Sequence, residues 1–123
     1  MKKLSTTKLS SLLLDSTNIT NLQGISKLIS LTEVDLRFNK LKGKSNDMND
    51  IFQITNLELL SLSDNLLSGH IPYDINQLKS LKKLRLANND IHGLLPAFEE
   101  HLQLRSIDLS NNKIGREIEI MLY

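Results

Sequence analysis

The chain has 123 residues, a net charge of +1 and no cysteine. This length fits one domain, the near-neutral charge gives no indication of a nucleic-acid partner, and the lack of cysteine excludes disulfides, thiolate metal sites and cysteine nucleophiles. No stretch approaches the roughly 18 apolar residues of a membrane-spanning helix, so membrane insertion is not expected.

The chain begins with a polar, basic segment, residues 1–8, which we interpret as the N-terminal edge of the fold. Its basic start is similar to that of a signal peptide, but Lys8 and Asp15 bracket an apolar run that is too short and too rich in serine. Without a signal peptide and without cysteine, the protein is expected to be cytoplasmic. Asn18-Ile19-Thr20 fits the glycosylation pattern N-x-T, which matters only in a secreted protein.

From Leu9 onward one spacing of apolar residues recurs, and its best-formed copy is Leu81–Ile91 (LKKLRLANNDI). The copies are separated by steps of 22, 26, 24 and 23 residues. They start at Leu9, Leu31, Leu57, Leu81 and Leu104. A near-constant period of this length indicates stacked structural units. Residues 1–123 are therefore expected to form a single repeat domain.

Each copy is expected to begin with a short strand in which inward apolar and outward polar residues alternate. Parallel strands about 4.8 Å apart then place each inward leucine against its neighbours. Behind the first strand, apolar residues recur every third position at Leu22, Ile25 and Leu28, which favours a short 3₁₀ or helical return. Gly69 and Gly93 permit turns in the third and fourth copies.

The ninth position of each copy carries an asparagine or, in the first copy, a threonine. The strand ends there and its backbone groups lose their partners, while an amide side chain offers both donors and an acceptor. These residues are predicted to stack as a structural ladder: Thr17, Asn39, Asn65, Asn89 and Asn112.

The block L-x-x-L-x-L-x-x-N-x-L is complete at Leu57 and Leu81 and conservatively changed in the other copies. In this the chain resembles the leucine-rich repeat family. The first copy is similar to the short 22-residue class, and the third and fourth, with LSGHIP and IHGLLP, are similar to the plant-type LxGxIP class. The resemblance implies an α/β leucine-rich repeat solenoid: a short curved horseshoe with a concave parallel sheet of about five strands and short helical or 3₁₀ returns on the convex side.

The resemblance also implies a non-catalytic module that binds a protein or peptide on the concave sheet. Two alternatives remain open. One is a regulatory or inhibitory subunit that docks on an enzyme such as a protein phosphatase, and the other is a ligand-sensing fragment of a larger receptor-like protein, which would be extracellular. Apolar residues at both ends, Leu9 and Ile118–Leu122, predict edge-to-edge self-association or flanking repeats.

The outward strand positions suggest where a partner binds. The second copy is acidic with an aromatic residue, the fourth is basic, and a leucine lies between them. The predicted partner-binding residues are Glu33, Asp35, Arg37, Phe38, Glu58, Leu59, Lys82, Lys83, Arg85 and Asp108. An apolar centre between opposite charges would anchor and orient a partner. The alternative is a solvated face with weak cross-strand pairs, Glu58 to Lys82 and Arg85 to Asp108, each worth about 0–1 kcal/mol.

No catalytic, metal or cofactor site is predicted. Lys42–Asp50 is rich in oxygen ligands but lacks the order of a calcium-binding loop, so a plain surface loop is expected. His70 and His92 lie two positions out of phase in adjacent copies and are not spaced as a metal pair. Glu99 and Glu100 are adjacent and do not face each other as a catalytic pair. The chain is therefore not expected to be an enzyme.

Overall fold

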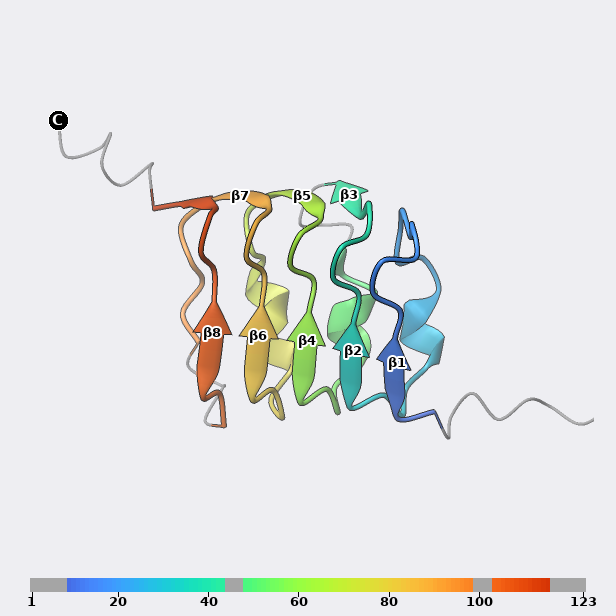
Figure 1. Ribbon diagram of the computed structural model, residues 1–123. Coiled ribbons are helices and arrows are strands. Elements are labelled where there is room, and N and C mark those ends of the chain that lie inside the picture. The colour runs from blue at the N-terminus through green and yellow to red at the C-terminus, as the bar shows by residue number, and fades with distance from the viewer. Residues whose placement is uncertain (1–8, 44–47, 99–102, 116–123) are drawn as a thin grey trace, which may run out of the picture.

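The computed structural model describes residues 9–43, 48–98 and 103–115. Each repeat contributes one strand to a five-stranded parallel sheet, called the concave sheet below, in the order β1-β2-β4-β6-β8 (Figure 1). The strands are β1 (Ser11–Leu13), β2 (Glu33–Asp35), β4 (Leu59–Ser61), β6 (Lys83–Arg85) and β8 (Ser106–Asp108). The predicted leucine-rich repeat solenoid is confirmed.

The central residue of each strand points into the core, and the register stacks these residues on one another. The column runs through Leu12, Val34, Leu60, Leu84 and Ile107. Its middle members are fully buried, whereas Leu12 is half-buried and Ile107 is 43% exposed. The difference arises because the middle residues have a repeat on each side, while those at the two ends are covered on one side only by the residues described.

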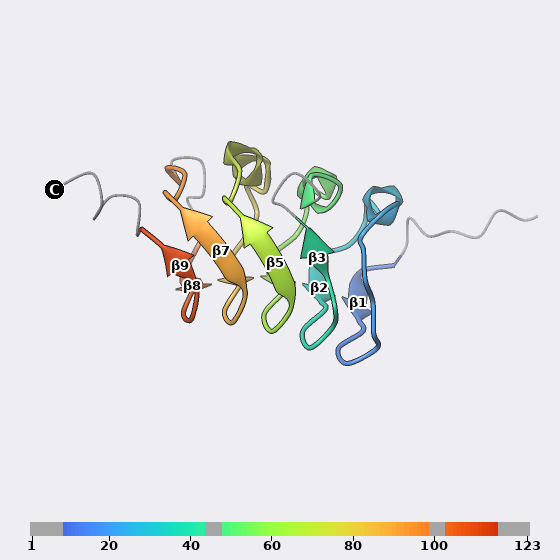
Figure 2. The same ribbon diagram turned by 90° about the horizontal axis from the view of Figure 1, so that it is seen from above.

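Short 3₁₀ helices form the convex side behind the concave sheet (Figure 2). They are η2 (Ile25–Lys27), η4 (Ile51–Gln53) and η5 (Tyr73–Gln77). Their apolar residues recur every third position, so that Ile51 and Ile54, like Ile75 and Leu78, are completely buried. Phe52 is also buried and belongs to the same core cluster.

A second parallel sheet, in the order β3-β5-β7-β9, crosses one side of the solenoid between the concave sheet and the 3₁₀ helices (Figure 2). Its strands are β3 (Lys42–Gly43), β5 (Leu66–Gly69), β7 (Asp90–Gly93) and β9 (Lys113–Ile114). Sequence reasoning treated these segments only as turns and missed the sheet. Their alternation buries Leu67 and Ile91, and the left-handed glycines Gly69 (φ 83°) and Gly93 (φ 85°) end the strands.

The second sheet has a different register from the concave sheet. Leu60 pairs with Leu84 in the concave sheet, whereas Ser68 pairs with Asp90 in the second. Paired residues in the second sheet are therefore two residues closer in sequence than paired residues in the concave sheet. This difference is called the two-residue lag below. As a result, residues that are two positions out of phase in the aligned repeats become neighbours.

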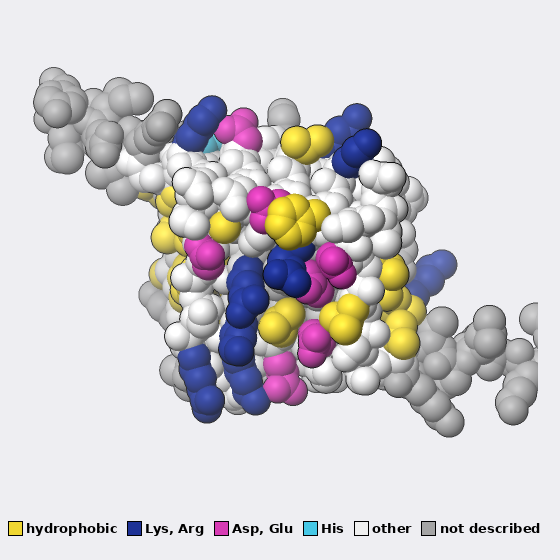
Figure 3. Space-filling model, in the orientation of Figure 1, with side chains coloured by type: hydrophobic (Ala, Val, Ile, Leu, Met, Phe, Trp, Pro, Cys, Tyr) yellow, Lys and Arg dark blue, Asp and Glu magenta, His cyan; other side chains and the backbone are white. Residues whose placement is uncertain are grey.

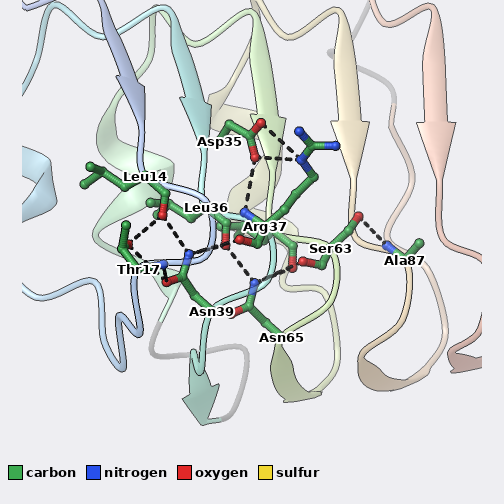
Figure 4. A network of polar contacts seen from close by, with 10 residues as sticks. Leu14, Thr17, Asp35, Leu36, Arg37, Asn39, Ser63, Asn65 and Ala87 are labelled. Carbon is green, nitrogen blue, oxygen red and sulfur yellow. Dashed lines mark hydrogen bonds and ion pairs between the residues drawn. The ribbon is translucent and has the colours of Figure 1, made fainter.

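The side chains at the ninth position of the repeats join adjacent repeats (Figure 4). The amide oxygen of Asn65 accepts from the backbone N–H of Leu41 at 2.9 Å, and its nitrogen donates to the carbonyls of Leu62 and Leu36, both at 3.0 Å. Asn39, Asn89 and Asn112 bond in the same way to their own strand end and to the preceding repeat.

Thr17, which has no amide, makes a shorter set of contacts at the same place in the first repeat. Its hydroxyl donates to the carbonyl of Leu14 at 2.7 Å, and its backbone N–H donates to the amide oxygen of Asn39 at 3.0 Å. A hydroxyl therefore bonds to its own strand end, while the amide in the next repeat supplies the connection between repeats.

Candidate functional site

The structure brings all ten predicted partner-binding residues onto one face, that of the concave sheet. Two outward columns flank the buried one. The first contains Ser11, Glu33, Leu59, Lys83 and Ser106, and the second contains Leu13, Asp35, Ser61, Arg85 and Asp108. Figure 3 shows basic side chains gathered over β6 beside acidic and hydrophobic ones over β4 and β2.

The remaining four predicted residues border these columns at the two ends of the strands. Glu58 and Lys82 precede β4 and β6 and, with Glu33, Leu59 and Lys83, line a hollow of about 210 Å³. At the other ends of the strands, Arg37 and Phe38, the second and third residues after β2, line a second hollow of about 380 Å³, called the upper hollow below. The upper hollow is lined by Arg37, Phe38, Ser63, Asp64, Arg85, Ala87, Asn88, Ser106 and Asp108.

Some charges on this face are paired within the chain. Lys82 Nζ lies 2.8 Å from a carboxylate oxygen of Glu58, which joins two adjacent repeats. Arg37 Nε donates to both carboxylate oxygens of Asp35, at 2.9 and 3.1 Å (Figure 4), and this contact raises the pKa of Arg37. Lys83, in contrast, has no hydrogen bond or ion pair from its side chain within the described part of the chain.

The expected pair between Arg85 and Asp108 is not formed. The Asp108 carboxylate instead accepts from the hydroxyl of Ser110 at 2.7 Å and from its backbone N–H at 3.0 Å. These bonds lower the pKa of Asp108, and the positive charge of Arg85 adds a smaller effect in the same direction. Among the residues described, the guanidinium of Arg85 is therefore left without a hydrogen-bonded partner.

Two outward positions of the third repeat are buried, which the alternating pattern did not predict. Ser61 is 1% exposed and lies between Asp35 and Arg85 in the register. Its hydroxyl has no hydrogen-bond partner among the residues that the structure describes. Ser63 accepts a hydrogen bond from the backbone N–H of Ala87 at 3.0 Å (Figure 4). Ser63 and Ala87 are both buried and form the floor of the upper hollow because their side chains are small.

The third residue after each strand of the concave sheet has a left-handed backbone in all five described repeats, with φ between 55° and 58°. These residues are Ser16, Phe38, Asp64, Asn88 and Asn111. Serine, aspartate and asparagine tolerate this conformation because their short polar side chains bond locally. Phe38 is the exception, because its side chain is large and apolar, and it is also 56% exposed.

His70 and His92, which are not spaced as a metal pair in the sequence, are neighbours in the structure. Their ring centroids are 5.1 Å apart in an edge-to-face arrangement. The two-residue lag of the second sheet cancels their two-residue phase difference. Among the described residues, no cluster of three or more histidine or carboxylate side chains is placed to hold a metal ion.

The polar loop expected at Lys42–Asp50 is described only in part. Asp50, one of its oxygen ligands, accepts a hydrogen bond from the backbone N–H of Gly24 at 2.9 Å and so connects the first two repeats. Residues 44–47 lie outside the described residues, as do residues 1–8, Glu99 and Glu100, and the apolar C-terminal segment Ile118–Leu122. In the part of the chain that the structure covers, no helix is long and apolar enough to cross a membrane.

The repeat geometry agrees with the comparison of the sequence with known families. The Leucine Rich Repeat family matches residues 56–78, 80–102 and 103–122. The chain belongs to the leucine-rich repeat family.

The chain is similar to parts of receptor proteins. It is 35% identical over 86 residues to Receptor-like protein CLAVATA2 of Arabidopsis thaliana, covering 70% of this chain and 12% of that protein. It is 43% identical over 101 residues to human Toll-like receptor 8, covering 77% of this chain and 9% of the receptor. The chain thus spans about a tenth of the length of these curated relatives.

Two solved structures show the same fold. The plant peptide hormone receptor RGFR1 in complex with RGF2 matches with a TM-score of 0.75 and 29% identity, over 88% of this chain and 18% of that chain. The leucine-rich repeat ectodomain of the receptor kinase SOBIR1 from Arabidopsis thaliana matches with a TM-score of 0.68 and 27% identity, over 84% and 70% of the two chains. These neighbours support a protein-interaction or ligand-binding module.

The expectation of a cytoplasmic protein is wrong. The relatives are receptor proteins, and structural neighbours such as that of SOBIR1 are ectodomains, which point to an extracellular setting. The expectation relied on the absence of a recognisable signal peptide and of cysteine. The absence of cysteine shows only that disulfides do not hold the fold together. Here the leucine core and the inter-repeat asparagine bonds connect the repeats, so the fold does not need the disulfides that an oxidising compartment permits.

Proposed function

We propose that the concave sheet is a non-catalytic surface that binds a protein or peptide partner. The observation that carries this proposal is the state of its charges: Lys83 and Arg85 have no side-chain partner within the described chain, while neighbouring charges are paired. Exposed Phe38 and half-buried Leu59 lie on the same face. Unpaired cations beside apolar side chains favour a partner that fills the hollows and brings carboxylates to β6.

The surface is formed before the partner arrives. Backbone ladders hold the five strands in register, and the core beneath them is fully buried in the middle repeats. A rigid platform loses little conformational entropy on binding. We therefore expect the partner to dock with little change in the backbone of the sheet.

A second candidate function is ligand sensing by a larger receptor-like protein to which this chain contributes several repeats. The observation in its favour is the similarity to receptors over about a tenth of their length. The peptide hormone complex of RGFR1 supports a peptide as the kind of ligand. Sequencing the complete transcript tests this candidate, which requires an open reading frame with further repeats.

Affinity purification with mass spectrometry tests the binding surface. The wild-type chain and a Phe38→Ala, Arg85→Glu variant are used as bait, and we expect the variant to lose the partners that the wild type retains. A matched control, Tyr73→Ala with Lys27→Glu, removes an exposed aromatic residue and reverses a charge on the convex 3₁₀ helices. Partners that remain on the concave variant would remove this face from consideration.

A further inference from the structure

Phe38 has a backbone conformation that its side chain disfavours. Its φ is 55°, in the left-handed region, where a bulky residue is a genuine outlier. The same position in the other described repeats carries Ser16, Asp64, Asn88 and Asn111, all residue types suited to that conformation. The second repeat therefore carries strain that an asparagine would remove.

Packing does not compensate for this strain. The side chain of Phe38 is 56% exposed and is not part of the buried core. Strained residues that the core does not need are concentrated at binding sites and ligand clamps. An exposed aromatic ring at a strained position is therefore better explained by a contact with a partner than by the fold.

The groups around Phe38 indicate the chemistry of that contact. Asp64 occupies the equivalent position in the next repeat and lines the upper hollow together with Phe38. Within the described chain, the Asp64 carboxylate has no hydrogen-bond or ion-pair partner. Arg37 also lines the upper hollow, but its guanidinium bonds to Asp35 (Figure 4), and the charge of Asp64 has only the smallest effect on its pKa. An aromatic face thus lies one repeat away from a half-buried carboxylate that forms no hydrogen bond or ion pair with a cation of the described chain.

We propose that Phe38 and Asp64 form a subsite for a basic side chain, lysine or arginine, of the peptide partner. The inference rests on the proposed function of the concave sheet and names one contact within it. The cation would lie over the ring of Phe38, whose face attracts positive charge, and would pair with Asp64.

An acidic side chain does not fit this place, because Asp64 would repel it. It would instead be drawn to Arg85, which lies two repeats from Phe38 and therefore about 10 Å away along the sheet. At that separation, salt screens the repulsion between Arg85 and a cation on Phe38. The upper hollow would thus accept a peptide with a basic residue over repeats two and three and an acidic group over repeat four.

Three substitutions separate the contributions of the subsite. Phe38→Asn removes the ring and the strain together, and Phe38→Leu removes the aromatic face but keeps an apolar side chain at the strained position. Asp64→Asn removes the charge with little change in shape, and asparagine tolerates the left-handed backbone.

The probe is a random peptide library displayed on phage and selected on the wild-type protein. Enriched peptides are resynthesised with each arginine replaced by citrulline or each lysine by norleucine.

We expect the enriched peptides to contain a basic residue whose replacement weakens binding to the wild type about tenfold. The same replacement should change binding to Asp64→Asn or Phe38→Leu by less than about twofold. Phe38→Asn should lose the peptides yet raise Tm by about 3 °C, because its backbone strain is relieved. A residue kept only for the fold would lower Tm when replaced.

The outcomes distinguish failure of the subsite proposal from failure of the proposed binding function of the concave sheet. Peptides that require Arg85 but bind Phe38→Leu and Asp64→Asn unchanged would overturn the subsite alone. The subsite is also overturned if removal of the basic residue has the same effect on all the proteins. Failure to enrich any peptide, or full binding to Phe38→Ala, Arg85→Glu, would overturn the proposed function and the subsite with it.

Discussion

The imidazole rings of His70 and His92 meet edge to face, with their centroids 5.1 Å apart. The repeats as aligned by their asparagines place these residues two positions apart, and the two-residue lag of the second sheet brings them together. The ring of His70 then lies over Gly93, in the place that a Cβ atom would occupy. The register of the second sheet, which differs from that of the concave sheet, therefore creates this contact.

Gly93→Ala should destabilise the protein by about 1–2 kcal/mol because alanine disfavours the left-handed backbone at φ 85°. The new methyl group should also push the exposed ring of His70 away from His92. Gly24→Ala is the matched control, because Gly24 has the same φ and open space around it. Urea denaturation measures both costs, and NMR should show a shift of the His70 ring signals only in Gly93→Ala. An unmoved His70 ring would contradict the contact.

Asn89→Ala should lower the free energy of unfolding by about 1–3 kcal/mol, because it leaves backbone groups of two repeats without partners. The lost bonds are those to the N–H of Leu67 and to the carbonyls of Leu62 and Leu86. Denaturant titration measures the effect, with the exposed Asn56→Ala as the control. An unfolding midpoint equal to that of the wild type would show that these bonds are not needed.

Ser61→Ala and Ser63→Ala should change the free energy of unfolding in opposite directions, although both side chains are buried. Within the described ranges the Ser61 hydroxyl has no hydrogen-bond partner, so its removal should stabilise the protein by up to about 1 kcal/mol. The Ser63 hydroxyl accepts from Ala87, so its removal should cost about 1 kcal/mol. Thermal melts of the two variants, compared with wild type, test the difference, and an equal loss in both would contradict it.

Asp90 should contribute to the dependence of folding stability on pH. Its carboxylate lies 2.9 Å from Lys113 Nζ, and this pair lowers the pKa of Asp90 below its usual 3.8. A carboxyl with a lower pKa in the folded state stabilises the fold above its unfolded pKa, and the contribution is lost as the pH falls through the folded value. NMR titration of the Asp90 carboxyl should show the lowered pKa, and Lys113→Gln should raise it. A pKa that does not respond to Lys113→Gln would rule out the pair as its cause.

Asn18 should carry a glycan if the protein is made in the secretory pathway. The side chains of Asn18 and Thr20 are exposed, and both lie outside the strands and 3₁₀ helices, as a glycosylation site requires. Expression with a heterologous signal sequence should yield a product whose electrophoretic mobility increases after treatment with a glycosidase. Asn18→Gln is expected to migrate like the treated protein, and an Asn18→Gln product that still shifts on treatment would place the glycan elsewhere.

The repeat pattern predicted the concave sheet well because each inward leucine and each asparagine acts at a fixed place within its own repeat. It did not predict the second sheet, whose strands are short and overlap turn-like sequences such as LSGHIP. The outward columns were placed correctly, but the burial of Ser61 was not foreseen. Whether an outward serine is buried depends on the side chains in the neighbouring repeats, here those of Asp35 and Arg85.

The sequence by itself determined that the chain stacks leucine-rich repeats and which residues face the core, because apolar spacing within one repeat sets the local path of the backbone. Only the tertiary structure decided what the repeats bring together. The pairing of Glu58 with Lys82, the contact of His70 with His92, and the position of the strained Phe38 beside Asp64 all depend on the register and conformation of neighbouring turns. Side-chain contacts between repeats follow from the register of each sheet. The repeat period along the chain does not specify that register.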